Sequence, residues 1–231
     1  MYGRKEVMKV KKDVMILTGA GQIGMAIARR MGYGKKIVIG DKKPENAQKI
    51  AEIMNNAGFD AEAVEMDLSS RESIRNLIAR AMECGDISML VNAAGVSPSQ
   101  ATAEELLQLD ILQLENIRDT LHAYQLAKRC NEKRVMAEAV KWGKRNARIN
   151  SISPGIIVTP LAVDELNGPR GDFYKNMFAN CPAGRPGTAD EVANAAELLM
   201  SDKGAFITGA DFLIDGGATA SYFYGPLKPE K

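Results

Sequence analysis

The sequence is poor in histidine and cysteine, and each shortage excludes a class of chemistry. With His122 as its one histidine, the chain has no histidine cluster for a catalytic relay or a multi-histidine metal site. Cys84, Cys130 and Cys181 are odd in number and widely spaced, which suits neither a disulfide framework nor a Cys-x-x-Cys metal site. We therefore expect no metal ion and a reducing, cytoplasmic location.

Long hydrophobic runs and an excess of one charge are also missing. No apolar run approaches the roughly 20 residues that a membrane-spanning helix needs. The basic stretch at residues 4–12 is interrupted by Glu6 and lacks an apolar core, so residues 1–12 are predicted to be a solvated N-terminal arm rather than a signal peptide. The net charge of +1 gives no field to attract nucleic acid or a membrane surface. We expect small-molecule partners and no nucleic acid or membrane partner.

Short apolar runs alternate with amphipathic segments along the chain. Predicted strands cover residues 14–17, 37–39, 61–66, 87–91, 148–152 and 206–214, and predicted helices cover 23–28, 44–54, 70–78, 116–142 and 189–200. This order predicts the α/β class: a Rossmann-type doubly wound parallel sheet with helices on both faces. We assign residues 1–231 to a single domain, with 159–187 as an irregular substrate loop and 218–231 as a C-terminal tail.

A glycine-rich turn connects the first predicted strand to the first predicted helix. Gly19, Gly21 and Gly24, with Gln22 and Ile23 between the last two, form a G-x-G-x-x-G motif in the context that makes it a pyrophosphate site. An ordinary strand-to-helix turn is the alternative. Asp41 ends the second strand 17 residues after Gly24, close to the offset of about 20 at which a carboxylate binds the adenosine ribose.

That carboxylate predicts NAD, because it would repel the 2′-phosphate of NADP. Lys42 and Lys43 follow it directly, and either ammonium is able to pair with a phosphate. NADP therefore stays possible, and Lys42 is kept among the cofactor-binding residues.

An ordered series of motifs resembles one family. The series is Thr18-Gly19-Ala20, Asp67-Leu68, Asn92-Ala93-Ala94-Gly95, Tyr124-x-x-x-Lys128, Pro154-Gly155-Ile156-Ile157-Val158-Thr159 and Ile214-Asp215-Gly216-Gly217. In order and sheet position it is similar to the short-chain dehydrogenase/reductase family, over about the whole chain. The resemblance implies that Asp67 and Leu68 flank the adenine and that Asn92, Ala93, Ala94 and Gly95 line the cofactor cleft. It further implies that Pro154, Gly155, Ile157 and Thr159 contact the nicotinamide side.

Tyr124 and Lys128 carry the predicted chemistry. Four residues apart on a helix, they share a face, and an ammonium near a phenol lowers the phenol pKa from its usual value of about 10. Tyr124 is then suited to act as general acid or base, and the resemblance implies that Lys128 also holds the nicotinamide ribose. The alternative is that the pair has no catalytic role and is only a half-buried tyrosine beside a solvated lysine. A second Tyr-x-x-x-Lys, at Tyr224, contains Gly225 and Pro226 and is not expected to be helical.

Two family residues and one segment are missing. The family serine at the end of the fifth strand and the asparagine of the preceding helix have no evident counterpart, and residues 96–123 offer no β-branched run for the expected strand. Either residues of the natural protein are absent from this sequence between Gly95 and Glu104, or the chain carries a genuine deletion with little activity. We favour the first, which predicts a Cα to Cα step far above about 3.8 Å in that interval.

The expected function is therefore hydride transfer between NAD(H) and a carbonyl or secondary alcohol. Residues 104–119 read as an acidic amphipathic segment, found in some hydroxysteroid dehydrogenase and carbonyl reductase members, and this implies an apolar substrate. The family also implies a homodimer or homotetramer. The rival function is a catalytically weak dinucleotide-binding sensor or scaffold that lacks the serine and asparagine.

Overall fold

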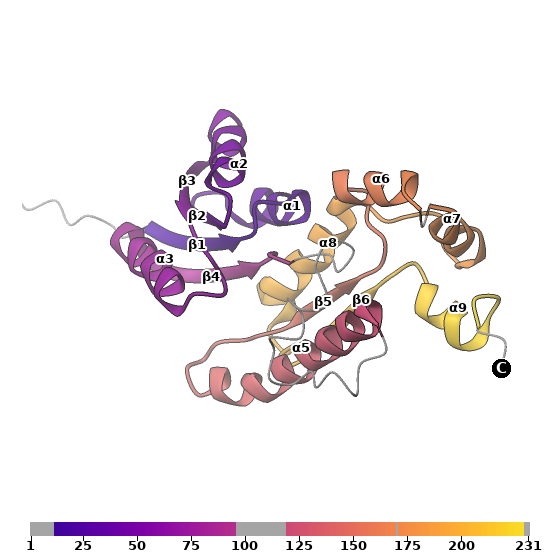
Figure 1. The fold of residues 1–231 in the computed structure, drawn as a ribbon. Helices are drawn as coiled ribbons and strands as arrows, with labels where there is room; N and C mark the ends of the chain where they lie inside the picture. The colour runs from indigo at the N-terminus through magenta and orange to yellow at the C-terminus, as the bar shows by residue number, and fades with distance from the viewer. Residues whose placement is uncertain (1–11, 96–118, 170, 229–231) are drawn as a thin grey trace, which may run out of the picture. The chain divides into compact units, whose positions relative to one another are not determined.

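The computed structural model describes residues 12–95, 119–169 and 171–228. They belong to two compact units, Met1–Ala94 and Gly95–Lys231. Each unit is built from parallel strands and helices (Figure 1). The assignment of both units to one domain stays a prediction.

The N-terminal unit contains a four-stranded parallel sheet in the order β3-β2-β1-β4. Its strands are β1 Lys12–Thr18, β2 Lys36–Asp41, β3 Asp60–Glu65 and β4 Gly85–Asn92. The chain moves outward from β1 through β2 to β3 and then returns to β4 on the other side of β1. Such a reversal is the switch point of a doubly wound sheet, where nucleotides bind at the carboxyl ends of the strands.

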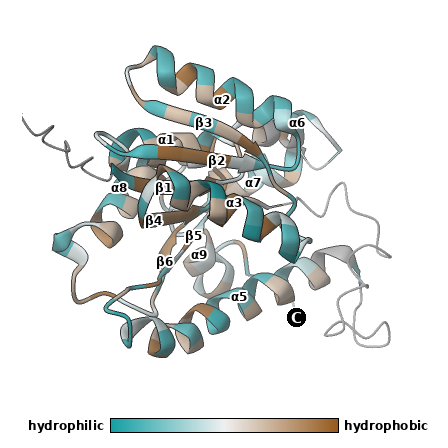
Figure 2. Cartoon of the chain, turned by 90° about the vertical axis from the view of Figure 1, so that its left-hand side faces the viewer, coloured by the Kyte–Doolittle hydropathy of each residue, from teal (hydrophilic) through white to brown (hydrophobic). Residues whose placement is uncertain are grey.

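Three helices cover the two faces of this sheet: α1 Gln22–Met31, α2 Pro44–Asn56 and α3 Arg71–Cys84. Strand residues of one face pack with α3 in a buried cluster of Val14, Ile16, Val38, Met66, Leu77 and Ala81. Leu17 is the next residue along β1 and faces the other way, against Gly24 of α1. Figure 2 shows the resulting pattern, with hydrophobic strands between helices that carry hydrophilic outer surfaces. The predicted fold class is confirmed.

The C-terminal unit has a smaller sheet. Its elements are α5 Thr120–Gly143, β5 Ser151–Pro154, α6 Pro160–Asn167, α7 Gly171–Asn180, α8 Ala189–Met200, a 3-10 turn at Asp202–Gly204, β6 Asp211–Ile214 and α9 Ala218–Tyr224. Strands β5 and β6 pair in parallel, with Ser151 opposite Asp211. The helix predicted at 189–200 is confirmed to the residue.

Two predicted irregular segments are wrong, because the structure places helices in them. Residues 159–187 contain α6 and α7. Pro160 occupies the first position of α6, and the Thr159 hydroxyl accepts a hydrogen bond from the Ala162 N–H at 3.2 Å. The tail at 218–231 contains α9, which begins where Asp215 accepts hydrogen bonds from the N–H groups of Gly217 and Thr219. The glycines and prolines around these helices are typical of loops, so the sequence pattern favoured irregular structure there.

Both strands of the small sheet are shorter than predicted. The stretch before β5 is held by side chains: the Arg148 guanidinium donates to the carbonyl oxygens of Leu199, Ser201 and Ile207. The Asn150 amide donates to the Ile207 carbonyl and accepts from the Ala210 N–H. Side-chain hydrogen bonds thus replace backbone hydrogen bonds between strands in this stretch. The paired strands begin only at Ser151 and Asp211.

Strand β4 forms an edge of its sheet. Within the residues that the structure describes, its outer side pairs with no strand, and β5 pairs only with β6. The expectation that the chain lacks a strand after β4 stays a prediction. The interval predicted to be incomplete, Gly95 to Glu104, lies outside the described residues apart from Gly95, as do the acidic segment before Asp119 and residues 1–11 of the predicted arm. Lys12, assigned to that arm, instead begins β1.

None of the described helices combines the length and the apolar character required to cross a bilayer.

Candidate functional site

The glycine turn has a different geometric requirement at each glycine. Gly19 has φ +86°, and a Cβ there would lie 2.5 Å from the Ala94 backbone. A Cβ on Gly21 would meet nothing within 4 Å, whereas one on Gly24 would lie 2.9 Å from the Leu17 side chain. These are the needs of a dinucleotide turn: a tight bend, open backbone for a pyrophosphate, and close helix-to-strand packing. The turn therefore fits the phosphates of a dinucleotide.

Hydrogen bonds hold the ends of three strands around this turn. The Gly19 N–H donates to the Gly40 carbonyl at 2.8 Å, and the Ala93 N–H donates to the Thr18 carbonyl at 2.8 Å. The buried Thr18 hydroxyl donates to the Asn92 side-chain oxygen at 2.7 Å. Residues 92–94 of the fourth-strand motif thus lie beside the turn, as the predicted cofactor cleft requires.

Asp41 lies against the same turn. One carboxylate oxygen accepts a hydrogen bond from the Ala20 N–H at 2.8 Å, and the other accepts from the Lys43 N–H at 2.9 Å. Each carboxylate oxygen has a second lone pair for a further donor. The position next to the pyrophosphate turn is the one from which a carboxylate reaches ribose hydroxyls.

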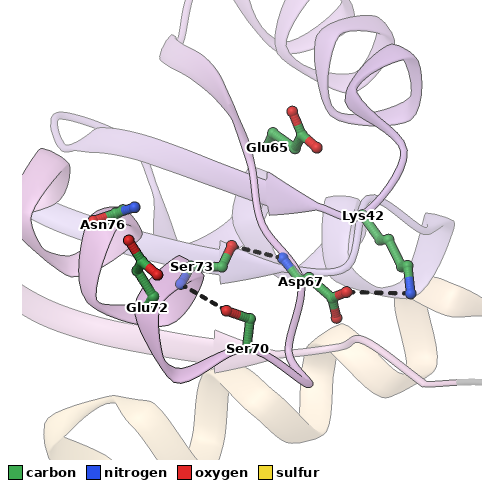
Figure 3. A pocket seen from close by; sticks show the side chains of 7 residues that line it. All are labelled: Lys42, Glu65, Asp67, Ser70, Glu72, Ser73 and Asn76. Atoms are coloured by element: carbon green, nitrogen blue, oxygen red, sulfur yellow. Dashed lines mark hydrogen bonds and ion pairs between the residues drawn. The ribbon is translucent and has the colours of Figure 1, made fainter.

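Asp67 lines a pocket of about 430 Å³ at the end of β3 (Figure 3). The pocket is polar, and its lining consists of Lys42, Glu65, Asp67, Ser70, Glu72, Ser73 and Asn76. The Asp67 N–H donates to the Ser73 hydroxyl, and one Asp67 oxygen accepts from the N–H and the hydroxyl of Ser69. The Lys42 ammonium lies 3.2 Å from the other oxygen. These contacts, Ser69 first and then Lys42, hold the pKa of Asp67 at about 2. Leu68, the next residue, is exposed.

Tyr124 and Lys128 come together on α5 in the C-terminal unit. The Lys128 ammonium lies 5.3 Å from the centre of the half-buried Tyr124 ring, within the range of a cation–π contact. A Cβ placed on Gly95 would lie 3.9 Å from the same ammonium. The structure therefore assembles the last glycine of the fourth-strand motif with the Tyr-x-x-x-Lys pair. His122 lies in the same helix, with its side chain outside the described part of the structure.

The segment after β5 is fixed mainly by backbone contacts. The Gly155 N–H donates to the Ile214 carbonyl at 3.1 Å, and a Cβ on Gly155 would lie 2.8 Å from the Cα of Asp215. Ile157 forms a parallel bridge with Gly187. Pro154 is the last residue of β5, and Thr159 caps α6. The predicted nicotinamide-side residues thus lie on the segment that leads from the carboxyl end of β5 to α6.

A pocket of about 210 Å³ borders the segment that follows β5. Its lining is mostly apolar or backbone and consists of Gly155, Ile156, Ile157, Met177, Phe178, Cys181, Ala183, Arg185, Gly187, Glu191, Ile214, Asp215, Gly216 and Ala218. Of the aromatic residues in the predicted substrate loop at 159–187, Phe178 lines the pocket. Phe173 is 62% exposed and packs edge-on against Tyr174 instead.

Two features of these pockets were missed in the sequence. Glu191 closes a capping box with Thr188 and pairs with Arg185 at 2.7 Å, which together hold the pKa of Glu191 at about 2, Arg185 making the larger contribution. The Thr-x-x-Glu pattern at 188–191 is a signal that predicts this box. The Lys42–Asp67 ion pair leaves no such signal, because it joins the ends of two different strands.

Two family models together match residues 13–219 of this chain. The family model for short chain dehydrogenases matches residues 13–117, and the model described as enoyl-(acyl carrier protein) reductase matches residues 103–219. A D-threitol dehydrogenase of Mycolicibacterium smegmatis is 32% identical over 246 residues, covering 89% of this chain and 92% of that protein. A short-chain dehydrogenase/reductase of Alternaria brassicicola is 29% identical over 266 residues, covering 91% and 97%.

Both alignments are longer than this chain of 231 residues. They therefore include positions at which the relative has residues and this chain has none. The fold is nevertheless shared: the crystal structure of gox2181 matches with a TM-score of 0.77 at 25% identity, covering 91% of this chain and 97% of that one. Family models that span residues 13–219, and relatives named as dehydrogenases, establish that this chain belongs to the short-chain dehydrogenase/reductase family of oxidoreductases, which bind NAD(P)(H).

Proposed function

We propose that this protein transfers a hydride between NAD(H) and a small carbonyl or secondary alcohol, with Tyr124 as the general acid and base. The observation that carries the proposal is the Lys128 ammonium 5.3 Å from the Tyr124 ring, next to Gly95. A positive charge at that place favours the phenolate form. A family member needs such a tyrosine to move a proton at neutral pH.

The residues have separate tasks. Tyr124 donates its hydroxyl proton to the carbonyl oxygen during reduction and accepts the alcohol proton during oxidation. Lys128 favours the phenolate and binds the nicotinamide ribose, while Pro154, Gly155, Ile157 and Thr159 position the nicotinamide side. When bound, the cofactor supplies or accepts the hydride itself.

The N-terminal unit holds the adenosine and pyrophosphate portions of the cofactor. The backbone at Gly19, Gly21, Gln22, Ile23 and Gly24 faces the pyrophosphate, with the positive end of the α1 dipole behind it. Asp41 accepts the ribose hydroxyls, and Asp67 and Leu68 flank the adenine. NAD is the preferred cofactor, because a 2′-phosphate would be repelled by the Asp41 carboxylate.

The substrate is a small carbonyl or alcohol with an apolar part. Support comes from the pocket of about 210 Å³, whose lining includes the apolar side chains of Ile157, Met177 and Phe178. A relative named for D-threitol supports an alcohol as the reduced form of the substrate. The active form is a homodimer or homotetramer.

A second function has its own support. The family serine and asparagine have no counterpart, and the alignments contain residues that this chain lacks. A chain without those residues could still bind a dinucleotide through its N-terminal unit and act as a sensor or scaffold. Turnover separates the two functions.

The decisive variant is Tyr124→Phe, assayed with NADH against a panel of ketones and aldehydes. We expect turnover to fall about a hundredfold or more, with NADH affinity nearly unchanged, because only the proton-transfer hydroxyl is lost. Tyr224→Phe is the matched control, since Tyr224 belongs to the second Tyr-x-x-x-Lys and is exposed on α9. An unchanged rate in Tyr124→Phe would remove Tyr124 from the mechanism.

A further inference from the structure

The Lys42–Asp67 ion pair joins two residues that have separate expected roles. Lys42 follows Asp41 directly at the end of β2, and Asp67 follows β3. The Lys42 ammonium lies 3.2 Å from one Asp67 oxygen (Figure 3). The other Asp67 oxygen accepts hydrogen bonds from the N–H and the hydroxyl of Ser69. The Asp67 side chain is thereby fixed in place, with one oxygen directed at the ammonium.

The Lys42 side chain is more exposed than the Asp67 carboxylate that holds it. The Lys42 side chain is 76% exposed, and its four-carbon stem has many rotamers. An exposed ion pair of this kind is weak, so a phosphate group nearby is able to compete for the ammonium. A lysine next to the ribose-binding carboxylate is well placed to reach a 2′-phosphate, for which ammonium groups are common ligands.

Two carboxylates therefore oppose NADP by different means. Asp41, fixed by the N–H groups of Ala20 and Lys43, repels a 2′-phosphate where it stands. Asp67 instead binds the Lys42 ammonium, the positive charge that would offset this repulsion. We propose that Asp67 is a specificity-determining positioning residue, which keeps Lys42 away from the cofactor ribose and thereby strengthens the preference for NADH over NADPH. This inference rests on the proposed function, since it requires that the N-terminal unit bind the adenosine half of the cofactor.

The test measures dissociation constants of NADH and NADPH by fluorescence titration of the full chain. Asp67→Asn is the main variant, because the amide keeps the size and an acceptor oxygen of Asp67 while losing the charge that holds Lys42. We expect the ratio of the NADPH to the NADH dissociation constant to fall about threefold to fivefold, the size of one exposed ion pair. Asp67→Glu, which keeps the charge, should retain the parent ratio.

Variants of Lys42 distinguish this route from direct repulsion by Asp67. Lys42→Met alone should change the ratio little, because Asp67 already holds the ammonium. In the double variant Asp67→Asn, Lys42→Met, the ratio should return to the parent value. Lys43→Met is the matched control, which removes the neighbouring charge and should leave the effect of Asp67→Asn intact.

Three results would overturn the inference: an unchanged ratio in Asp67→Asn, a lowered ratio that persists without Lys42, or loss of both cofactors in Asp67→Asn alone. The first shows no influence of Asp67, the second shows direct repulsion, and the third shows a role in adenine binding only. A parent protein that binds neither cofactor would instead contradict the proposed function. The two failures are thus distinguishable.

Discussion

The sheets of the two units differ in how completely their strands are covered. In the N-terminal unit, β1 has a partner on each side, and Val14, Met15, Ile16 and Leu17 are almost fully buried. In the C-terminal unit, β6 pairs with β5 alone in the described residues, and Leu213 is 52% exposed. The edge strand β4 likewise leaves Leu90 51% exposed. The central strand β1 therefore removes far more of its apolar surface from solvent than β4 or β6 does.

The largest expected effect compares a central strand with that edge. Leu17→Ala should lower the free energy of unfolding by about 2–5 kcal/mol, because it leaves a cavity among fully buried side chains. Leu90→Ala should cost about 1 kcal/mol or less, because half of its surface already meets solvent. Urea denaturation of both variants measures the difference. An equal cost at Leu90 would mean that something covers β4 in solution.

The next effect compares two glycines of one turn. Gly19→Ala should destabilise the protein by at least about 1–2 kcal/mol, from the left-handed backbone alone, and should abolish most NADH binding. The contact with the Ala94 backbone adds to this cost. Gly21→Ala should unfold at nearly the parent temperature, since its Cβ would meet nothing within 4 Å. Equal melting temperatures for the two variants would show that the turn is looser than described.

Much of the N-terminal unit could be predicted from its sequence, for a physical reason. Its two inner strands β1 and β2 are continuous apolar runs buried on both faces. Ser70 caps α3 as expected, accepting a hydrogen bond from the Ser73 N–H. The C-terminal unit was harder, because its helices α6 and α7 lie among glycines and prolines and its strands are bounded by the side-chain contacts of Arg148 and Asn150. No local pattern predicts such long-range contacts.

In the candidate site, too, the residues specified by a local motif could be predicted and those brought together by long-range contacts could not. Gly19 and Asp41 could be predicted because the motif and its spacing specify them, and Tyr124 with Lys128 because helical spacing places them on one face. The ion pair between Lys42 and Asp67 could not, because it depends on the register of two neighbouring strands.

A smaller effect sharpens the role of the N-terminal unit in cofactor choice. Asp41→Ala should weaken NADH binding about tenfold or more, because hydrogen bonds to a charged group are lost, and should weaken NADPH binding much less. Titration with both cofactors measures the change in ratio. Glu45→Ala removes an equal charge from the first turn of α2 and should leave the ratio intact. A parent that binds NADPH as tightly as NADH would contradict the preference.

The smallest effect belongs to the C-terminal unit. The folded-state pKa of Glu191 is about 2, below its ordinary value of 4.5, so its contribution to stability is complete above the ordinary value and is lost as the pH falls towards 2. Glu191→Gln should therefore show a smaller loss of melting temperature between about pH 5 and about pH 3 than the parent. Asp172→Asn, which removes a fully exposed carboxylate paired with Lys175, is the control and should follow the parent. A parent-like slope in Glu191→Gln would refute the capping role.

The most direct test of the central claim is transfer of deuterium from NADH labelled at C4 of the nicotinamide to a carbonyl substrate. The intact mass of the protein is measured alongside and compared with 25.0 kDa, because a heavier protein would carry the residues that this sequence lacks. The account predicts that the label appears on the carbinol carbon of the alcohol product and that transfer is lost in Tyr124→Phe. Tight binding of NADH without transfer to any carbonyl in the panel would contradict it and favour the sensor or scaffold function.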